Sequence, residues 1–129
     1  VVALVEAAGK DFVGINIDPG NAVWAMEDPI ANLEVMAPYV LTSSMRDSIV
    51  WESDKGATVQ WIAMGGGVVD FPRYFEIFAT KCPGVPVHIE TISGFNRELP
   101  YLDEAHWALY PEMLAGPFAR FVALAKKGR

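Results

Sequence analysis

The sequence predicts an α/β fold, a partial (β/α)8 TIM barrel of about three to four βα units with parallel strands and outer helices. Short β-branched segments alternate with longer segments of helical periodicity, and each predicted strand ends in a polar residue. Three strands do not close a barrel, and the 129 residues are half of the roughly 250 that a complete barrel takes. We therefore expect a single domain over residues 1–129.

Gly and Pro residues mark the boundaries of the first predicted helices and strands. Residues 1–9 have the pattern of the last turns of a helix, so we expect the chain to begin inside an element. Residues 12–18 are apolar and β-branched and run into a turn over residues 18–21, which predicts a buried strand followed by a loop. Asp28 and Pro29 then predict the start of a helix that ends at residue 38.

The rest of the chain continues the alternation. Asp70 is expected to cap a helix whose inward side chains are Phe71, Phe75, Ile77 and Phe78. The other expected elements are strands over 39–45 and 85–91, an insertion over 48–67 with a short strand over 59–64, and helices over 71–81, 103–110 and 112–126.

Composition excludes several classes of protein. With 16 acidic and 10 basic residues the net charge is −6, which makes the chain a poor general binder of nucleic acid. Its cations cluster only in the run at residues 126–129, which is expected to be a solvated helix end. No uncharged apolar run reaches the roughly 18 residues of a membrane span. The single cysteine, Cys82, excludes an internal disulfide and is expected to be a small buried side chain near a helix end. We expect a cytoplasmic protein without a nucleic-acid or membrane partner.

Polar side chains end all three predicted strands. In parallel α/β folds the loops after the carboxyl ends of strands build the active site. Glu90 is the most informative of these residues, because a carboxylate within an apolar strand costs several kcal/mol unless it is paired, protonated or metal-bound. The pairs expected to share a face are Asn16 with Asp18, Thr42 with Ser44, and His88 with Glu90.

Other candidate residues leave two interpretations open. Asp18 precedes Pro-Gly-Asn, so it suits both a turn and a ligand role. Trp24 and Trp51 are expected in loops at the active rim, where they either stack on a sugar or simply pack. Residues 65–67 are three glycines without the Lys-Ser/Thr of a P-loop, which predicts a flexible loop. The expected structural residues are His106 and the core tryptophans Trp61 and Trp107.

Four segments together resemble the sugar phosphate isomerase/epimerase family, whose fold is a xylose-isomerase-like TIM barrel. They are VGINIDPGN at 13–21, TSSMRD at 42–47, MGGGVVDF at 64–71 and VHIE at 87–90, in the order and spacing of that family. The segments match the C-terminal half of the barrel, so the resemblance implies that residues 1–129 are this half.

The resemblance implies a divalent metal, most often Mn²⁺ and sometimes Mg²⁺, Co²⁺ or Zn²⁺, held by two Glu, one Asp and one His. In the epimerases of the family the two glutamates move a proton at the carbon next to a carbonyl, which the metal polarises. By resemblance, Asp18 and Glu90 are metal ligands, and Glu90 is also the acid/base. The residues expected to contact substrate are Asn21, Ser44, Arg46, Trp24 and His88. For His88 the alternative is a hydrogen-bonded core histidine that supports a ligand from behind.

The sequence departs from the family pattern at two ligands. Ser44 stands where the family has its His ligand, although Arg46 and Asp47 keep the rest of that motif. The first Glu belongs to an earlier strand that this chain does not contain. The expected function is therefore a metal-dependent isomerase or epimerase of a sugar or sugar phosphate, incomplete in this chain and completed by the N-terminal half of the barrel or by a second copy.

Two alternatives stay open. A non-catalytic half-barrel that self-associates or binds a partner would hide its open sheet, and the mean hydropathy of +0.23 is high for so acidic a chain. The apurinic endonuclease branch of the same barrel would need more His ligands and a basic groove, so Ser44 and the net charge of −6 count against it.

Overall fold

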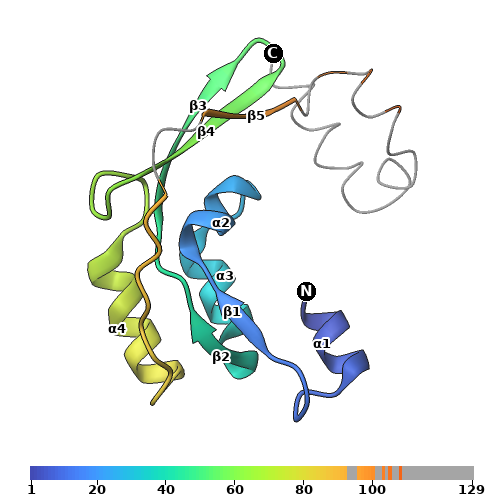
Figure 1. Cartoon of the computed structure of the whole chain (residues 1–129), viewed down its shortest axis with the longest axis vertical. Coiled ribbons are helices and arrows are strands. Elements are labelled where there is room, and N and C mark those ends of the chain that lie inside the picture. The colour runs from blue at the N-terminus through green and yellow to red at the C-terminus, as the bar shows by residue number, and fades with distance from the viewer. Residues whose placement is uncertain (93–95, 101–102, 104, 106–107, 109–129) are drawn as a thin grey trace. The chain divides into compact units, whose positions relative to one another are not determined.

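The computed structural model describes residues 1–92, 96–100, 103, 105 and 108 (Figure 1). The chain divides into two compact units, residues 1–50 with 60–95, and residues 51–59 with 96–129. The helix expected over 112–126 lies outside the described residues, as do His106 and Trp107, and the helix expected over 103–110 is described at three positions only. The fold is mixed α/β, with a small parallel sheet and a separate sheet of three strands.

The first unit opens with helix α1, Val2–Ala8, which ends at Gly9 with a φ of +95°, as the sequence predicts. Strand β1, Ile15–Ile17, is shorter than the strand expected over 12–18. The loop expected after it is wrong, because helix α2, Pro19–Trp24, begins there. The Asn21 N–H donates to Asp18 Oδ1 (3.1 Å), so this Asp-Pro pair starts a helix by capping its first turn.

The next βα unit follows the predicted order. Asp28 caps helix α3, Pro29–Met36, and a 3-10 turn, Ala37–Tyr39, leads into strand β2, Val40–Ser43. Strands β1 and β2 are parallel, as expected. The register skips Leu41, because Ile15 lies opposite Val40 and Asn16 lies opposite Thr42. This bulge lets Val40 and Ser43, three residues apart, both be buried while Leu41 is exposed.

The third predicted strand, over 85–91, is reduced to one parallel bridge between Met45 and Ile89. Pro86 has no N–H to give to a ladder, and Ser43 Oγ takes over the pairing by donating to Pro86 O (2.7 Å) and accepting from the His88 N–H (3.1 Å). The expectation of a buried apolar strand is wrong here, since Ile89 is 70% exposed. Glu90 is therefore not a carboxylate enclosed by apolar side chains.

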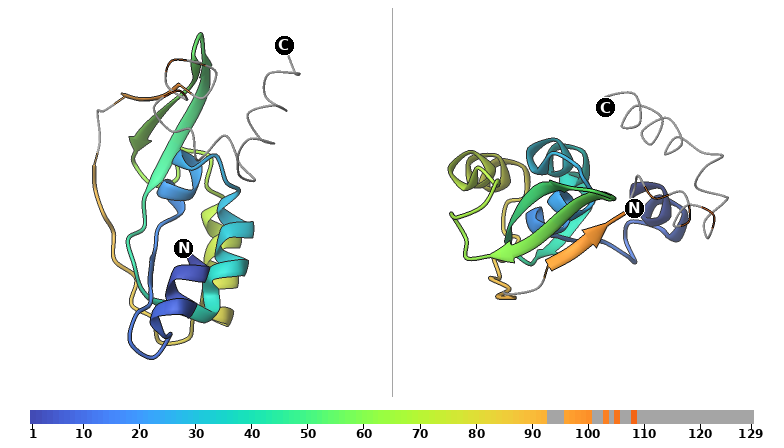
Figure 2. Two further views of the ribbon diagram at one scale, coloured as in Figure 1. Left: turned by 90° about the vertical axis from the view of Figure 1, so that its right-hand side faces the viewer. Right: turned by 90° about the horizontal axis from the view of Figure 1, so that it is seen from above.

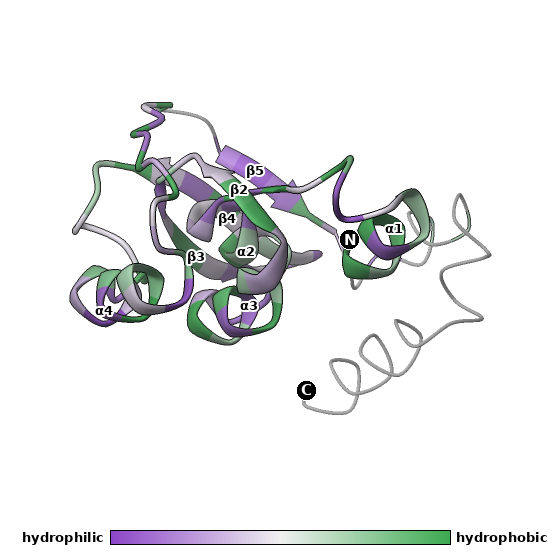
Figure 3. Ribbon diagram, turned by 90° about the horizontal axis from the view of Figure 1, so that it is seen from below, coloured by the Kyte–Doolittle hydropathy of each residue, from purple (hydrophilic) through white to green (hydrophobic). Residues whose placement is uncertain are grey.

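The insertion expected over 48–67 is a β-hairpin of two strands, β3, Asp47–Ser53, and β4, Gly56–Ile62. Two residues join them, so they are antiparallel. Strand β5, Asn96–Leu99, was not predicted; it completes the sheet in the order β3-β4-β5 and is hydrophilic (Figure 3). Trp51 lies in β3 and not in a loop, which corrects its predicted position.

Helix α4, Phe71–Lys81, begins at its predicted cap, where Asp70 Oδ1 accepts from the Arg73 N–H (3.1 Å). Its buried residues are Phe71, Tyr74 and Phe78, which share one face at helical spacing. The prediction is confirmed for Phe71 and Phe78, whereas Phe75 and Ile77 are only partly buried and Tyr74 takes the central position.

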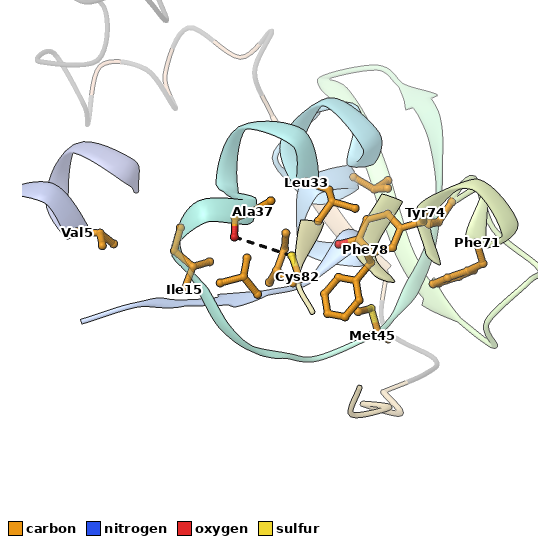
Figure 4. Close-up of a cluster of buried hydrophobic side chains, with 13 residues drawn as sticks. Val5, Ile15, Leu33, Ala37, Met45, Phe71, Tyr74, Phe78 and Cys82 are labelled. Atoms are coloured by element: carbon orange, nitrogen blue, oxygen red, sulfur yellow. Dashed lines mark hydrogen bonds between the residues drawn. The ribbon is translucent and has the colours of Figure 1, made fainter. Parts of the chain in front are cut away.

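Helices α3 and α4 lie side by side against one face of the β1–β2 pair (Figure 2). The core between them holds Leu33 from α3, Ile17 from β1 and Met45 after β2, together with the aromatic face of α4 (Figure 4). Cys82 is buried at the end of α4 with its Sγ 3.9 Å from Ala37 O, as the sequence predicts.

Candidate functional site

Three residues from three neighbouring segments meet at the carboxyl ends of the parallel strands. Asp18 directly follows β1, Arg46 follows β2, and Glu90 follows the bridge to Ile89. Arg46 Nε donates to Asp18 Oδ2 (2.8 Å), and Arg46 Nη2 contacts the same oxygen. Arg46 Nη1 lies 3.4 Å from Glu90 Oε1. We call these three residues the carboxylate–guanidinium cluster.

The cluster is buried at one end and open at the other. The side chains of Asp18 and Arg46 are 5% and 9% exposed, whereas that of Glu90 is 40% exposed. The guanidinium also lies over the ring of Trp61, 5.2 Å from its centroid, which adds a cation–π contact. One cation thus serves two carboxylates, and the half-exposed Glu90 is the group that solvent or a ligand can reach.

The two tryptophans near the cluster pack on each other. Trp24 meets Trp61 edge to face with ring centroids 4.8 Å apart. Trp61 is buried, as predicted for a core residue. Trp24 lies at the end of α2 and not in a loop, so of the two interpretations left open for it, packing is the one that its position supports.

A row of polar side chains crosses the exposed face of the parallel sheet beside the cluster. Asn16 Nδ2 donates to Ser44 Oγ (3.0 Å), and Thr42 Oγ1 lies 3.4 Å from His88 Nδ1. The first contact joins β1 to the residue after β2, and the second joins β2 to the segment before Ile89. We call Asn16, Thr42, Ser44 and His88 the polar row. His88 is exposed and does not take the place of a core histidine.

A pocket of about 280 Å³ borders the cluster along β1. Its polar lining includes Asn16, Asp18 and Asn21, and its apolar lining includes Ile15, Ile17 and Met36. This volume lies just below the usual range of ligand pockets, about 300 to 1,000 Å³. Of the predicted substrate contacts, Asn21 lines this pocket, Ser44 and His88 belong to the polar row, and Arg46 belongs to the cluster.

Asp47 has a role that sequence reasoning missed. Its fully buried carboxylate accepts from four backbone N–H groups, those of Ser48 (2.9 Å), Gly65 (2.9 Å), Gly67 (2.9 Å) and Val69 (3.2 Å). The glycine loop over residues 65–67, which was expected to be flexible, is therefore held by hydrogen bonds to the first residue of β3. Its N–H groups at 65 and 67 are occupied by a carboxylate and are not free to hold a phosphate. Asp47 and the glycines are 18 to 20 residues apart in the sequence, so no local pattern signals this contact.

The donors in this arrangement do not fit a divalent metal. Each oxygen of Asp18 is already used, Oδ1 by the α2 cap and Oδ2 by Arg46, and Glu90 Oε1 faces the same guanidinium. Ser44 Oγ is engaged with Asn16. Among the described residues, no three or more His, Cys, Asp or Glu side chains group as metal ligands would. The metal implied by the resemblance stays a prediction.

No protein-family model matches this chain, and no curated protein or solved structure shows significant similarity to it. Within the described part of the chain, no helix has the length and apolar character needed to cross a membrane. The family resemblance of the sequence stays a prediction.

Proposed function

We propose that this chain is the substrate-binding half of an isomerase or epimerase that acts on a sugar or sugar phosphate by proton transfer next to a carbonyl. The observation that carries the proposal is the convergence of Asp18, Arg46 and Glu90 at the ends of the parallel strands. The polar row and the pocket along β1 surround this point with hydroxyl, amide and imidazole groups, which suit a polyhydroxylated ligand.

Glu90 is the proposed acid/base, because it is the only member of the cluster with a substantially exposed side chain. Its carboxylate takes the proton from the carbon next to the substrate carbonyl, and the electrons of that C–H bond pass into an enediolate. Delivery of the proton to the neighbouring carbon, with transfer of the hydroxyl proton to the former carbonyl oxygen, gives an isomer. An epimer requires a second acid on the opposite face of the same carbon, a role that the resemblance gives to the Glu of the N-terminal half. Arg46 holds the Glu90 carboxylate at the strand end while the reaction proceeds.

Solvent exchange tests this proposal without knowledge of the natural substrate. In D₂O, proton NMR would follow the loss of the proton next to the carbonyl in a panel of aldoses, ketoses and their phosphates. We expect exchange with one member of the panel and amide shift changes at Asn16 and Asn21. Glu90→Gln should abolish exchange and keep the shift changes, whereas Glu34→Gln, which changes an exposed carboxylate on α3, should keep both the exchange and the shift changes. Equal exchange in Glu90→Gln would reject the acid/base role.

A second function, association into a closed assembly, is favoured by a different observation. Leu41, Val87 and Ile89 are exposed apolar side chains on or beside the parallel strands. The proposed partner is the N-terminal half of a barrel or a second copy of this chain, in the cytoplasm. Sedimentation of the chain should give dimers or larger species that Leu41→Ser together with Ile89→Ser dissociates, whereas a monomer at all concentrations would reject this function.

A further inference from the structure

We propose that Arg46 is the resident cation of this site, and that its guanidinium takes the position between Asp18 and Glu90 in place of a divalent metal. The chain should then bind no metal at this pair of carboxylates unless Arg46 is removed. The inference does not rest on the proposed function, because it needs only the charges and contacts of the carboxylate–guanidinium cluster.

The first step of the argument is the pairing of Asp18. A buried carboxylate needs a counter-charge, and Arg46 supplies it through two nitrogens, Nε and Nη2, that both meet Oδ2. The remaining oxygen, Oδ1, caps α2. A metal at Asp18 would therefore have to break the ion pair or the helix cap before it gained a ligand.

The second step is that Arg46 is itself held in place. Its side chain is 9% exposed, and its guanidinium lies over the ring of the buried Trp61. Gly20 clears the space for its backbone, because a Cβ at Gly20 would lie 2.8 Å from Arg46 Cβ and 3.2 Å from its carbonyl carbon and oxygen. Arg46 cannot swing into solvent without leaving a buried, stacked position, so a metal would have to compete with a fixed charge.

The third step is the number of ligands that a metal would gain. With Arg46 displaced, the site offers a metal two carboxylates, those of Asp18 and Glu90. Divalent cations such as Mn²⁺ or Zn²⁺ take roughly four to six donor atoms. Ser44, at the position of the expected His ligand, bonds to Asn16 within the polar row instead. A planar guanidinium needs only acceptors around its edge, which is what two carboxylates provide.

Titration with Mn²⁺, followed by paramagnetic broadening of amide NMR signals, tests the proposal. In the unmodified chain we expect no saturable broadening at Asp18 and Glu90. In Arg46→Met we expect saturable broadening at both residues, with Mn²⁺ binding at least about tenfold tighter, since the two freed carboxylates then attract the cation. Arg73→Met removes an exposed arginine on α4 and should behave like the unmodified chain.

Arg46→Met leaves a buried carboxylate unpaired and can therefore fail to fold. Two further measurements test the proposal in that case. Arg46→Lys keeps the positive charge and should still show no broadening at Asp18. The Arg46 Nε–H signal of the unmodified chain should be resolved, slow to exchange with solvent, and unchanged by Mn²⁺. Saturable broadening at Asp18 and Glu90 in the unmodified chain would overturn the proposal whatever the variants do. That result would still allow the proposed proton transfer on a sugar, with a metal taking part. Failure of the D₂O exchange assay would reject the proposed function but would not affect the proposal that Arg46 is the resident cation.

Discussion

The two faces of the β1–β2 pair differ sharply. On one face Leu33 of α3 is fully buried, and the neighbouring core residues from β1 and α4 are enclosed with it. On the other face Leu41 is 64% exposed, and the side chains of the polar row bond across the strands. The same short sheet is thus held together by packing on one side and presents polar side chains on the other.

The largest effect should come from truncating matched leucines on the two faces. Leu33→Ala removes a fully buried side chain and should lower the free energy of unfolding by about 2 to 5 kcal/mol, because it leaves a cavity between α3 and the sheet. Leu41→Ala should change it by less than about 0.5 kcal/mol. Urea unfolding of both variants measures the difference, and equal losses would show that both faces are packed.

Asp47 joins the two parts of the first unit that the hairpin separates in sequence. Asp47→Asn replaces one acceptor oxygen by an N–H₂ donor that faces backbone N–H groups, so we expect a loss of about 3 kcal/mol in the free energy of unfolding. Asp11→Asn, at an exposed carboxylate, is the control and should cost nothing measurable. Hydrogen exchange should accelerate at Gly65 and Gly67 in Asp47→Asn, and unchanged protection there would contradict the fastening of the loop.

Alkaline pH should weaken the packed face. Burial raises the pKa of Tyr74 and of Cys82 above their ordinary values. The unfolded chain therefore loses these protons at lower pH than the folded chain, so stability falls as pH rises, above about pH 9 for Cys82 and about pH 10 for Tyr74. The slope should approach about 1.4 kcal/mol per pH unit for each ionising group. Urea unfolding at successive pH values measures it, and a flat profile would contradict the burial of both groups.

The smallest effect concerns a single hydroxyl. Among the described residues, the Tyr74 hydroxyl is buried without a hydrogen-bond partner, which is costly for a polar group. Tyr74→Phe should leave the free energy of unfolding unchanged or raise it by up to about 1 kcal/mol. The matched variant Tyr39→Phe removes a hydroxyl that donates to Glu6 Oε1 (2.6 Å) and should not stabilise the chain. A clear loss of stability in Tyr74→Phe would mean that this hydroxyl is paired.

The sequence predicted the packed face better than the open one. Asp28, Asp70 and Gly9 mark helix ends correctly, because capping is a local interaction that sequence spacing records. The Asp-Pro pair at 18 and 19 carries the same signal, and it was misinterpreted as a turn because Gly20 follows it.

The errors have non-local causes. The short strand expected over 59–64 overlaps β4, but its partner β3 was missed because no Asn-Gly turn joins the two. The third strand was predicted too long, because Ser43 Oγ and not a backbone ladder pairs with Pro86 and His88. Asp18, Arg46 and Glu90 were all named from the sequence. Their assembly around one guanidinium was not, because the distance between Arg46 and its partners depends on how strands separated by 28 and 44 residues align.

A double-mutant cycle between Asp18 and Arg46 tests the central claim most directly. Asp18→Asn, Arg46→Met and the double variant would be unfolded in urea beside the unmodified chain. Because each single variant leaves one buried charge unpaired, we predict a coupling free energy of about 2 to 3 kcal/mol between the two side chains, and a double variant less damaged than the sum of the singles. A coupling free energy near zero would show that the two charges do not meet, and would contradict the site described above.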